Sequence, residues 1–568
     1  MAETLVSPGV LARENDSSFV TQGPVTVGGA IIGPTVKGPV EIPTVVTSYS
    51  DYQSRFGTTL DSGSDTYTYF TSIAAYNYFN NGGESLLVAR VVTGSYTAAS
   101  TIGDQAPSSS ATSGSFILET LGEGVIMNSS SSLDISGSLE SGSVNNVRWE
   151  ITNPSTSSGT FDLLIRRGDD TTNNKIVLET WTGLSLDPSG DNFISRVIGD
   201  QVENYNVTKN QIDVTGSFRN ASRYVRVKEV VEPTLNYFDN NGIAKAEFTP
   251  LIPVASSGSF KSATGDLKDG TKFYQNIEAN NTQGLDGGNY TNMISLLSNQ
   301  DEYVYNALMA PGLFNSGHAS ECTSLINNTQ VRGDALLILD LVPYNSTVTA
   351  VNSQAASRNT SYAASYWPWC QVIDPDTGKQ VWVPASTVVG GVYAYNDSVS
   401  EPWFAPAGIN RGGLGQVIRA EQKLTSSQRD SLYTGKVNPI ATFPGTGVVV
   451  YGQKTLQTRA SALDRVNVRR LLIQLKSYIS QVGQTLVFEQ NTIATRNNFL
   501  AQVNPYLESV QQRQGLYAFK VIMDDTNNTP DVIDRNQLIG QIFIQPTKTA
   551  EFIYLDFNVL PTGATFPA

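Results

Sequence analysis

The sequence predicts a multidomain protein of mixed α/β and α+β fold class, and three observations support this prediction. The chain has 568 residues, whereas one hydrophobic core rarely serves more than about 250–300 residues. Its middle alternates helical patterns with an almost wholly apolar strand at 335–341 (ALLILDL), which favours a sheet covered by helices on both faces. Short alternating strands and Ser/Thr/Gly-rich stretches precede this region and predict an inserted β-rich domain.

The last quarter of the chain begins with one amphipathic helix, residues 465–486. Its apolar residues recur at alternating steps of four and three, which places them on one stripe of an α-helix; they are Val468, Leu472, Leu475, Ile479, Val482 and Leu486. Asp464 precedes the helix, where an acid interacts favourably with the first turn. Arg465, Arg469 and Lys476 lie off the stripe, so the sequence predicts a basic face that contacts either solvent or an acidic partner.

Strand patterns follow this helix at 515–521 and 539–544, and a third pattern at 552–559 alternates. The third pattern places four apolar side chains on one side: Ile553, Leu555, Phe557 and Val559. At the other end of the chain, residues 1–20 indicate an extended arm, punctuated by Pro8-Gly9. A small sheet that ends in such a strand has an open edge, and the unpaired backbone groups of an edge can pair with another chain.

Composition argues against several classes of function. A net charge of −14 at pH 7 argues against binding nucleic acid through charge. The sequence has no apolar run of about 18 residues and no signal-peptide pattern, so we expect no membrane partner. Two cysteines, Cys322 and Cys370, make no disulfide framework and are typical of a reducing compartment. We therefore expect a protein that folds in a cytoplasm.

The sequence predicts no catalytic residue, no cofactor and no metal site. His318 is the one histidine, so any Ser-His-Asp or Cys-His site would have to use it. Cys322 follows four residues later on a predicted helix, but two ligands do not make a zinc site. We interpret His318 as a helix-terminal residue and Cys322 as a buried thiol.

Three short motifs are similar to functional sites but have simpler interpretations. Residues 447–455 nearly spell a phosphate-binding loop, yet Gln453 stands where the lysine belongs and the residues between form a strand pattern. The Arg-Gly-Asp tripeptide at 332–334 precedes the apolar strand and is interpreted as a connection. Residues 374–379 offer two carboxylates but lack the other oxygen ligands of a calcium loop, and they indicate a hairpin turn.

A series of motifs in fixed order gives the most specific signal in the chain. The first group is SPGV at 7–10, GP at 33–34 and 38–39, YFNNGG at 78–83 and VARV at 88–91. The second is YWPW at 366–369, DPDTG at 374–378, VWVP at 381–384, GGVYA at 390–394, APAG at 405–408, NPI at 438–440 and FPGTG at 443–447. Together they resemble the sheath proteins of bacteriophage contractile tails. Tyr451 stands where that family usually has Trp, and Asn396-Asp397 where it tends to Thr-Asp.

This resemblance implies a structural subunit and not an enzyme. It implies that copies polymerise as stacked hexameric rings in a helical tube around a tail tube, and that contraction drives the tube through the host envelope. The implied partners are further copies of the chain, the tail tube protein, the baseplate and the tail terminator. The implied location is the virion tail, after assembly in the host cytoplasm. Alternatives are the sheath of a phage-like injection device (a tailocin or a secretion-type system), an adhesin-like tail protein and a hydrolase-like enzyme.

The resemblance also suggests domains and interface residues. We predict an N-terminal extended arm at 1–20, an N-terminal α/β part at 21–95, a β-rich outer domain at 96–250, an α/β middle domain at 251–436 and a C-terminal sheath core domain with a terminal strand arm at 437–568. We expect the N- and C-terminal parts to form one helix-on-sheet core domain. Strand exchange between copies would use Leu5, Val6, Val10, Ile553, Leu555, Phe557 and Val559. The tube would contact Arg465, Arg469, Arg470 and Lys476.

Overall fold

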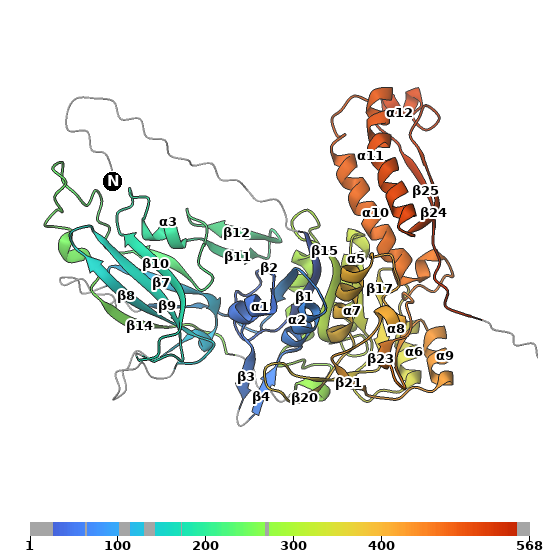
Figure 1. The fold of residues 1–568 in the computed structure, drawn as a ribbon, viewed down its shortest axis with the longest axis horizontal. Helices are drawn as coiled ribbons and strands as arrows, with labels where there is room; N and C mark the ends of the chain where they lie inside the picture. Colours follow the sequence, from blue (N-terminus) through green and yellow to red (C-terminus); the bar gives the residue numbers. More distant parts are fainter. Residues whose placement is uncertain are drawn as a thin grey trace, which may run out of the picture.

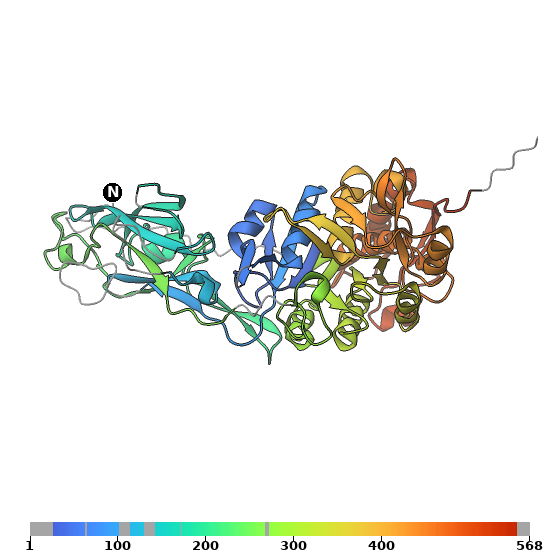
Figure 2. The same cartoon turned by 90° about the horizontal axis from the view of Figure 1, so that it is seen from below.

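The computed structural model describes residues 26–62, 65–101, 114–129, 142–171, 173–266 and 272–553. These residues form an elongated molecule with a β-sheet domain at one end, a central α/β domain, and a helical module that stands on the other end (Figures 1 and 2). The predicted mixed α/β multidomain class is confirmed. The predicted arm at 1–20, with Leu5, Val6 and Val10, lies outside the described residues, and so do Leu555, Phe557 and Val559.

The central domain is built on a six-stranded sheet in the order β17-β16-β15-β1-β5-β2. Its strands are β1 (Thr26–Gly33), β2 (Thr44–Val46), β5 (Leu86–Arg90), β15 (Val304–Phe314), β16 (Leu336–Asp340) and β17 (Ala363–Ala364). All neighbours are parallel except β2, which runs antiparallel to β5. Every residue of β5 and of β16 is buried, because helices cover both faces of the sheet.

Two hydrophobic cores occupy the two faces of this sheet. One contains residues of α2 (Phe70–Asn80) and α7 (Ser386–Val399), and the other contains residues of α4 (Thr291–Leu296), α5 (Ala319–Arg332) and α6 (Val348–Ala356). On β1, Ile31 packs in the first core and Ile32 packs in the second. Successive side chains of a strand point to opposite faces, so one short apolar run contributes to both cores.

The N-terminal strands belong to this central sheet. β1 pairs with β15 over residues 26–31 and with β5 over residues 29–33. The N-terminal strands therefore pair with the middle of the chain, and a separate core domain formed by the N- and C-terminal parts stays a prediction. The N-terminal strands β1 and β5 contain apolar runs, which indicate burial on two faces. Such a run does not specify which strand lies beside it.

Smaller elements complete the central domain. Its other helices are α1 (Tyr49–Phe56), α8 (Gly408–Arg411) and α9 (Ser426–Thr434), and a hairpin is formed by β3 (Thr59–Ser62) and β4 (Asp65–Thr68). One three-stranded sheet contains β20 (Gln380–Val383), β19 (Cys370–Ile373) and β21 (Val417–Ala420); another contains β18 (Tyr366–Trp367), β22 (Asn438–Phe443) and β23 (Gly447–Val450). None of the helices in the described part of the chain has the length and apolarity to span a membrane.

The β-rich domain is inserted between β5 and β15 of the central sheet. It contains a seven-stranded antiparallel sheet in the order β10-β9-β8-β14-β6-β7-β13. The strands are β6 (Ala98–Thr101), β7 (Phe116–Glu123), β8 (Val147–Ser155), β9 (Thr160–Arg167), β10 (Val177–Ser185), β13 (Val225–Val230) and β14 (Ser256–Lys261). Helix α3 (Ile194–Ile198) and the hairpin of β11 (Val202–Asn206) and β12 (Gln211–Thr215) accompany it. Trp149 is buried in its core, where Phe116 stacks on Phe161.

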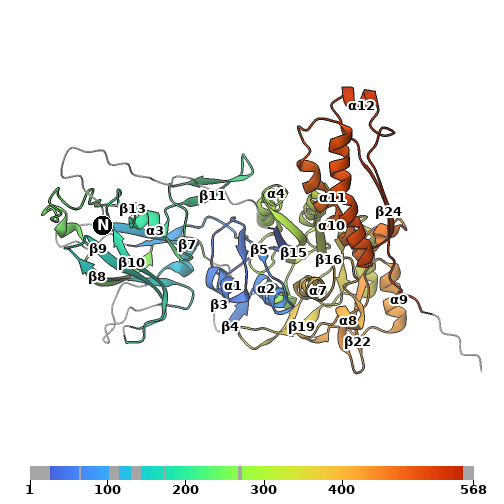
Figure 3. The same ribbon diagram turned by 45° about the horizontal axis from the view of Figure 1, so that its top comes forward.

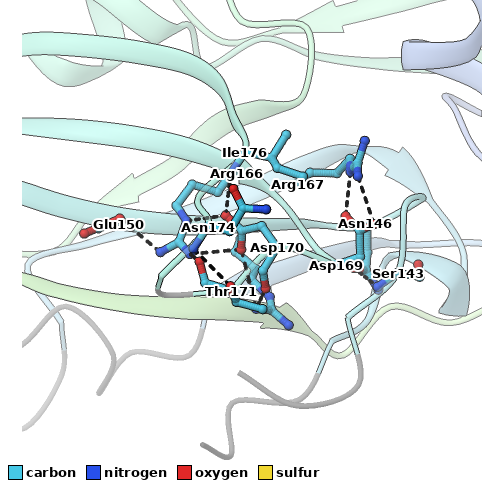
Figure 4. A network of polar contacts seen from close by, with 11 residues as sticks. Ser143, Asn146, Glu150, Arg166, Arg167, Asp169, Asp170, Thr171, Asn174 and Ile176 are labelled. Atoms are coloured by element: carbon cyan, nitrogen blue, oxygen red, sulfur yellow. Dashed lines mark hydrogen bonds and ion pairs between the residues drawn. The ribbon is translucent and has the colours of Figure 1, made fainter. Parts of the chain in front are cut away.

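A buried ion network holds the turn between β9 and β10 (Figure 4). The Asp170 carboxylate is fully buried and accepts hydrogen bonds from Arg166 Nε at 2.7 Å, from Arg166 Nη2 at 2.9 Å and from the backbone N–H of Ile176 at 3.0 Å. Arg148 Nη1 lies 3.6 Å from the same carboxylate. Arg166 also pairs with Glu150 at 3.0 Å. Opposite charges therefore meet in this buried site, which fixes the turn to the sheet.

The C-terminal module contains α10 (Val466–Gln484), α11 (Ile493–Gln512), β24 (Leu516–Ile522), α12 (Pro530–Asp534) and β25 (Gln541–Pro546). The two long helices lie beside the hairpin β24-β25 (Figure 3). The predicted helix at 465–486 and the strands at 515–521 and 539–544 are confirmed. Helix α11 was not predicted from the sequence, because Pro505 lies inside the helix and polar residues separate its buried side chains.

Candidate functional site

Helix α10 joins the C-terminal module to the central domain. Val466 and Ile473 pack in one core of the central domain, whereas Leu475 and Val482 pack in the module's own core. All residues from 466 to 471 are buried, so the base of α10 is enclosed on every side. The predicted exposed basic face is therefore wrong for the base of the helix.

Arg469 and Arg470 are buried in this junction, and each lies over a tyrosine ring of the central domain. The guanidinium of Arg469 is 4.0 Å from the ring centroid of Tyr362. That of Arg470 is 4.8 Å from the ring centroid of Tyr393, and its Nη2 is 2.5 Å from the Asp397 carboxylate. Each arginine is only 4% exposed. Both side chains therefore hold α10 on the central domain, by ion pairing and by cation–π contact.

The partners of these arginines were missed from the sequence. Asp397 stands within the motif series, but it is separated from Arg470 by 73 positions. Tyr393 lies on α7 in the same series. Spacing predicts contacts within one helix or one strand pair, and it does not pair charges across domains. A buried arginine and an exposed one therefore give the same sequence pattern.

Arg465 and Lys476, the other two predicted tube-contact residues, are more accessible. Arg465 is the residue before α10; its Nη1 is 2.9 Å from Asp464, and its Nε is 2.7 Å from Glu551. Lys476 is exposed on α10, with its Nζ 3.3 Å from the Tyr362 hydroxyl. Of these four basic residues, Lys476 alone is exposed to solvent, whereas Arg465 is half-buried and Arg469 and Arg470 are buried.

The hairpin β24-β25 has two open edges. Phe519 opposes Ile544 and Val521 opposes Ile542, and within the described residues neither strand pairs with a third. In β25, side chains alternate between exposed and half-buried positions, so one face packs on the module while Phe543 faces outward. The outer edge of each strand presents backbone N–H and C=O groups that another strand can pair with.

A groove of about 850 Å³, lined by both polar and apolar residues, lies at the tip of the module, far from the base of α10. Its apolar lining includes Ile479, Leu486, Phe499, Met523, Ile533, Leu538 and Ile542. Phe488, in the turn between α10 and α11, is fully exposed at its rim and has a left-handed backbone with φ 71°. A bulky residue with this φ is uncommon.

The single histidine is part of the fold of the central domain. His318 is the N-cap of α5, and its Nδ1 accepts a hydrogen bond from the backbone N–H of Phe314 at 3.3 Å. Burial lowers the pKa of His318 and raises the pKa of the Cys322 thiol to about 12. In the described ranges, no group of three or more His, Cys, Asp or Glu side chains could hold a metal ion.

The three short motifs that are similar to functional sites, at residues 447–455, 332–334 and 374–379, also have structural roles. Residues 447–450 form β23, as the strand interpretation predicted. Gly333 ends α5 in the left-handed conformation, and Arg332 is buried with an ion pair to Asp334, which confirms a connection. The residues between β19 and β20 form the predicted hairpin turn, and the Asp374 carboxylate accepts a hydrogen bond from the backbone N–H of Asp376 at 3.1 Å.

Comparison with known proteins places these domains in a family. Residues 285–456 match the family described as the phage tail sheath protein central domain, and residues 458–560 match the phage tail sheath C-terminal domain. The tail sheath protein of Vibrio phage KVP40 is 38% identical over 247 residues, which cover 43% of this chain and 36% of that protein. The tail sheath protein of Enterobacteria phage T4 is 40% identical over 185 residues, which cover 33% of this chain and 28% of that protein.

A solved structure agrees at the level of the fold. The sheath tail protein of Listeria innocua has a TM-score of 0.51 and 10% identity, with 92% of this chain and 96% of that chain covered. The matched part of this chain spans about a third of the length of its curated relatives. The two adjacent domain matches and these relatives name the same family, phage tail sheath proteins, that the motif series resembles. Residues 285–456 and 458–560 of this chain therefore carry the central and C-terminal domains of the phage tail sheath protein family.

Proposed function

We propose that this protein is the structural subunit of a contractile tail sheath, which polymerises as stacked hexameric rings around a tail tube. The hairpin β24-β25 carries the proposal, because its two outer edges are unpaired within the described residues, in a domain that matches the sheath C-terminal domain. Strand addition at such edges would join copies through main-chain hydrogen bonds. The donated strands would be residues 1–20 and 552–559 of neighbouring copies.

Contraction in this proposal is a change of packing between rigid domains. Exchanged strands keep copies connected while the domains rotate. The free energy would be stored during assembly, as an extended lattice relaxes to one that buries more surface between copies. The chain's role is therefore mechanical, and we assign catalysis to none of its residues.

The proposed partners are further copies of the chain, the baseplate, the tail terminator and the tail tube. For the tube contact we propose Lys476, because its ammonium is exposed on α10. Arg469 and Arg470 instead contact Tyr362 and Asp397 within the junction between α10 and the central domain. Charge reversal at either one would bury a carboxylate beside the tyrosine rings and unfold the junction, so it would not report on the tube.

Electron microscopy of the purified full-length chain tests the proposal directly. We expect long, striated, hollow tubes, formed either spontaneously or on added tail tubes. Monodisperse particles at every concentration would contradict the proposal. Capsid proteins and packaged DNA in native particles that contain the chain would identify a phage; particles without them would identify a phage-like injection device.

Deletion of residues 1–15 is expected to leave a folded monomer that does not polymerise, because the arm that pairs with the open hairpin edge is lost. Circular dichroism and sedimentation measure the fold and the assembly separately. A matched control replaces residues 1–15 by a scrambled sequence of the same composition, which keeps the length of the arm. Tubes of normal length from the deletion variant would contradict strand donation by the N-terminus.

A further inference from the structure

The last described residues of the chain return from the C-terminal module to the central domain. Strand β25 ends at Pro546, and the chain then descends toward the body of the molecule (Figure 1). Thr547 is still tied to the hairpin, since its backbone N–H donates to the Gly515 carbonyl at 3.2 Å. Thr549 already contacts the central domain, where its hydroxyl accepts a hydrogen bond from Gln453 Nε2 at 2.5 Å.

Glu551 makes the main contact of this segment. Its Oε2 accepts a hydrogen bond from the Tyr433 hydroxyl at 2.7 Å, and its Oε1 accepts from Arg465 Nε at 2.7 Å and from Gln453 Nε2 at 3.0 Å. The Glu551 side chain is 18% exposed. Two residues later, Ile553 is 75% exposed and lies in no strand. The carboxylate of Glu551 is thus the last fixed point of the described chain.

The three donors come from three segments that hold each other in place. Tyr433 lies on α9, Gln453 follows β23, and Arg465 precedes α10. The backbone N–H of Val466 donates to the Gln453 carbonyl at 2.8 Å, and Lys454 forms a β-bridge with Arg465. The site therefore exists as part of the central domain, independently of the segment that contributes Glu551.

Two cations surround the Tyr433 ring. Lys454 Nζ lies 4.2 Å from the ring centroid and donates to the Tyr433 carbonyl at 2.7 Å. The guanidinium of Arg465 lies 5.8 Å from the same centroid, and Asp464 is the other carboxylate beside it. A pocket with two cations, a phenol and an amide is complementary to one carboxylate, since hydrogen bonds to an ionised acceptor are the strong ones.

We propose that Glu551 is a positioning residue that anchors the C-terminal segment to the central domain and sets the point from which the chain leaves toward a neighbouring copy. This inference rests on the proposed exchange of terminal strands. Tension on an exchanged strand would be resisted at Tyr433, Gln453 and Arg465, and it would not peel β25 from β24. The C-terminal arm is then mechanically part of the central domain, although it follows the C-terminal module in sequence.

The first test measures the anchor without any assembly. Hydrogen–deuterium exchange of the soluble full-length protein is expected to be about tenfold faster over residues 547–553 in Glu551→Ala, as the loss of charge-assisted hydrogen bonds predicts. Residues 516–522 keep their wild-type rate. Tyr433→Phe, which keeps the ring but removes one donor, gives an intermediate rate. Glu508→Ala, at an exposed position of α11, is the matched control and leaves the rate unchanged. Wild-type exchange in Glu551→Ala would overturn the anchor.

A pH series checks the ionisation state of the anchor. Burial raises the pKa of Glu551, but hydrogen bonds from Arg465, Tyr433 and Gln453 outweigh burial and hold it below the usual value. A carboxyl with a lowered pKa contributes stability above its unfolded pKa, of about 4.3, and loses it as the pH falls through the folded pKa. The difference in exchange rate between wild type and Glu551→Ala is expected to persist at pH values above the unfolded pKa and to vanish at pH values below the folded pKa. A difference that persists at the acidic end would contradict the ionised anchor.

The second test measures assembly. Glu551→Ala is expected to raise the protein concentration needed for tube formation about tenfold, with Tyr433→Phe intermediate and Glu508→Ala like wild type. If wild type forms no tubes, the proposed function fails, and the exchange data still decide whether the anchor exists. Faster exchange together with wild-type tube formation would overturn the role of the anchor in strand donation.

Discussion

Replacing Asp170 by Ala is expected to lower the free energy of unfolding of the β-rich domain by about 3–5 kcal/mol, the usual cost of removing one partner from a buried ion pair. The Asp170 side chain is completely buried, pairs with Arg166 (Figure 4) and lies 3.6 Å from Arg148. The variant would leave these two guanidinium groups buried with one negative charge fewer. The backbone N–H of Ile176 would also lose its acceptor, which adds the desolvation cost of an unpaired donor.

The neighbouring residue supplies a matched control for this prediction. Asp169 pairs with Arg167, but their side chains are 29% and 38% exposed. Exposed pairs contribute about 0–1 kcal/mol, so Asp169→Ala is expected to change stability little. Hydrogen–deuterium exchange of β8 and β9 in the full-length protein reports the β-rich domain separately from the rest. Equal effects of the two substitutions would contradict the buried network.

Replacing Asp397 by Ala is expected to be more harmful than replacing its partner Arg470 by Met. Without Asp397, the guanidinium of Arg470 stays buried at the base of α10 with no carboxylate at 2.5 Å, and such a loss costs about 3–5 kcal/mol. Without Arg470, the Asp397 carboxylate is left 28% exposed and is hydrated. A methionine can then fill the space over the Tyr393 ring, so we expect a loss of about 1–2 kcal/mol from this substitution.

Two measurements on the monomer compare the stability losses of Asp397→Ala and Arg470→Met. Urea unfolding gives the free energy of unfolding, and hydrogen–deuterium exchange over residues 466–475 reports the base of α10. The control is Glu401→Ala, which removes a half-exposed pair with Arg513 and is expected to cost under about 1 kcal/mol. If Arg470→Met is as unstable as Asp397→Ala, the predicted asymmetry is contradicted. The cost of Asp397→Ala would then come from loss of the ion pair itself and not from leaving a buried guanidinium without a carboxylate.

The local elements of this protein follow from local rules. The steps of four and three in α10 predict the helix because each apolar residue returns to the same stripe. The apolar run of β16 predicts a strand buried on both faces for a similar reason. Helix α11 was missed where the rule fails, since Pro505 is a helix breaker in isolation and is accommodated inside α11 in the folded chain.

The amino-acid sequence alone determined the helices and strands with strong periodicity, the structural interpretation of the three short motifs that are similar to functional sites, and the resemblance to sheath proteins through the ordered motifs. Only the tertiary structure decided that β1 and β5 complete the central sheet, that Arg469 and Arg470 are enclosed, and that Glu551 returns to Tyr433. The physical reason is that periodicity reports which side of an element is apolar, whereas pairing depends on groups that lie far apart in sequence. A charge on the polar side of a helix is solvated or buried according to what the rest of the chain places beside it.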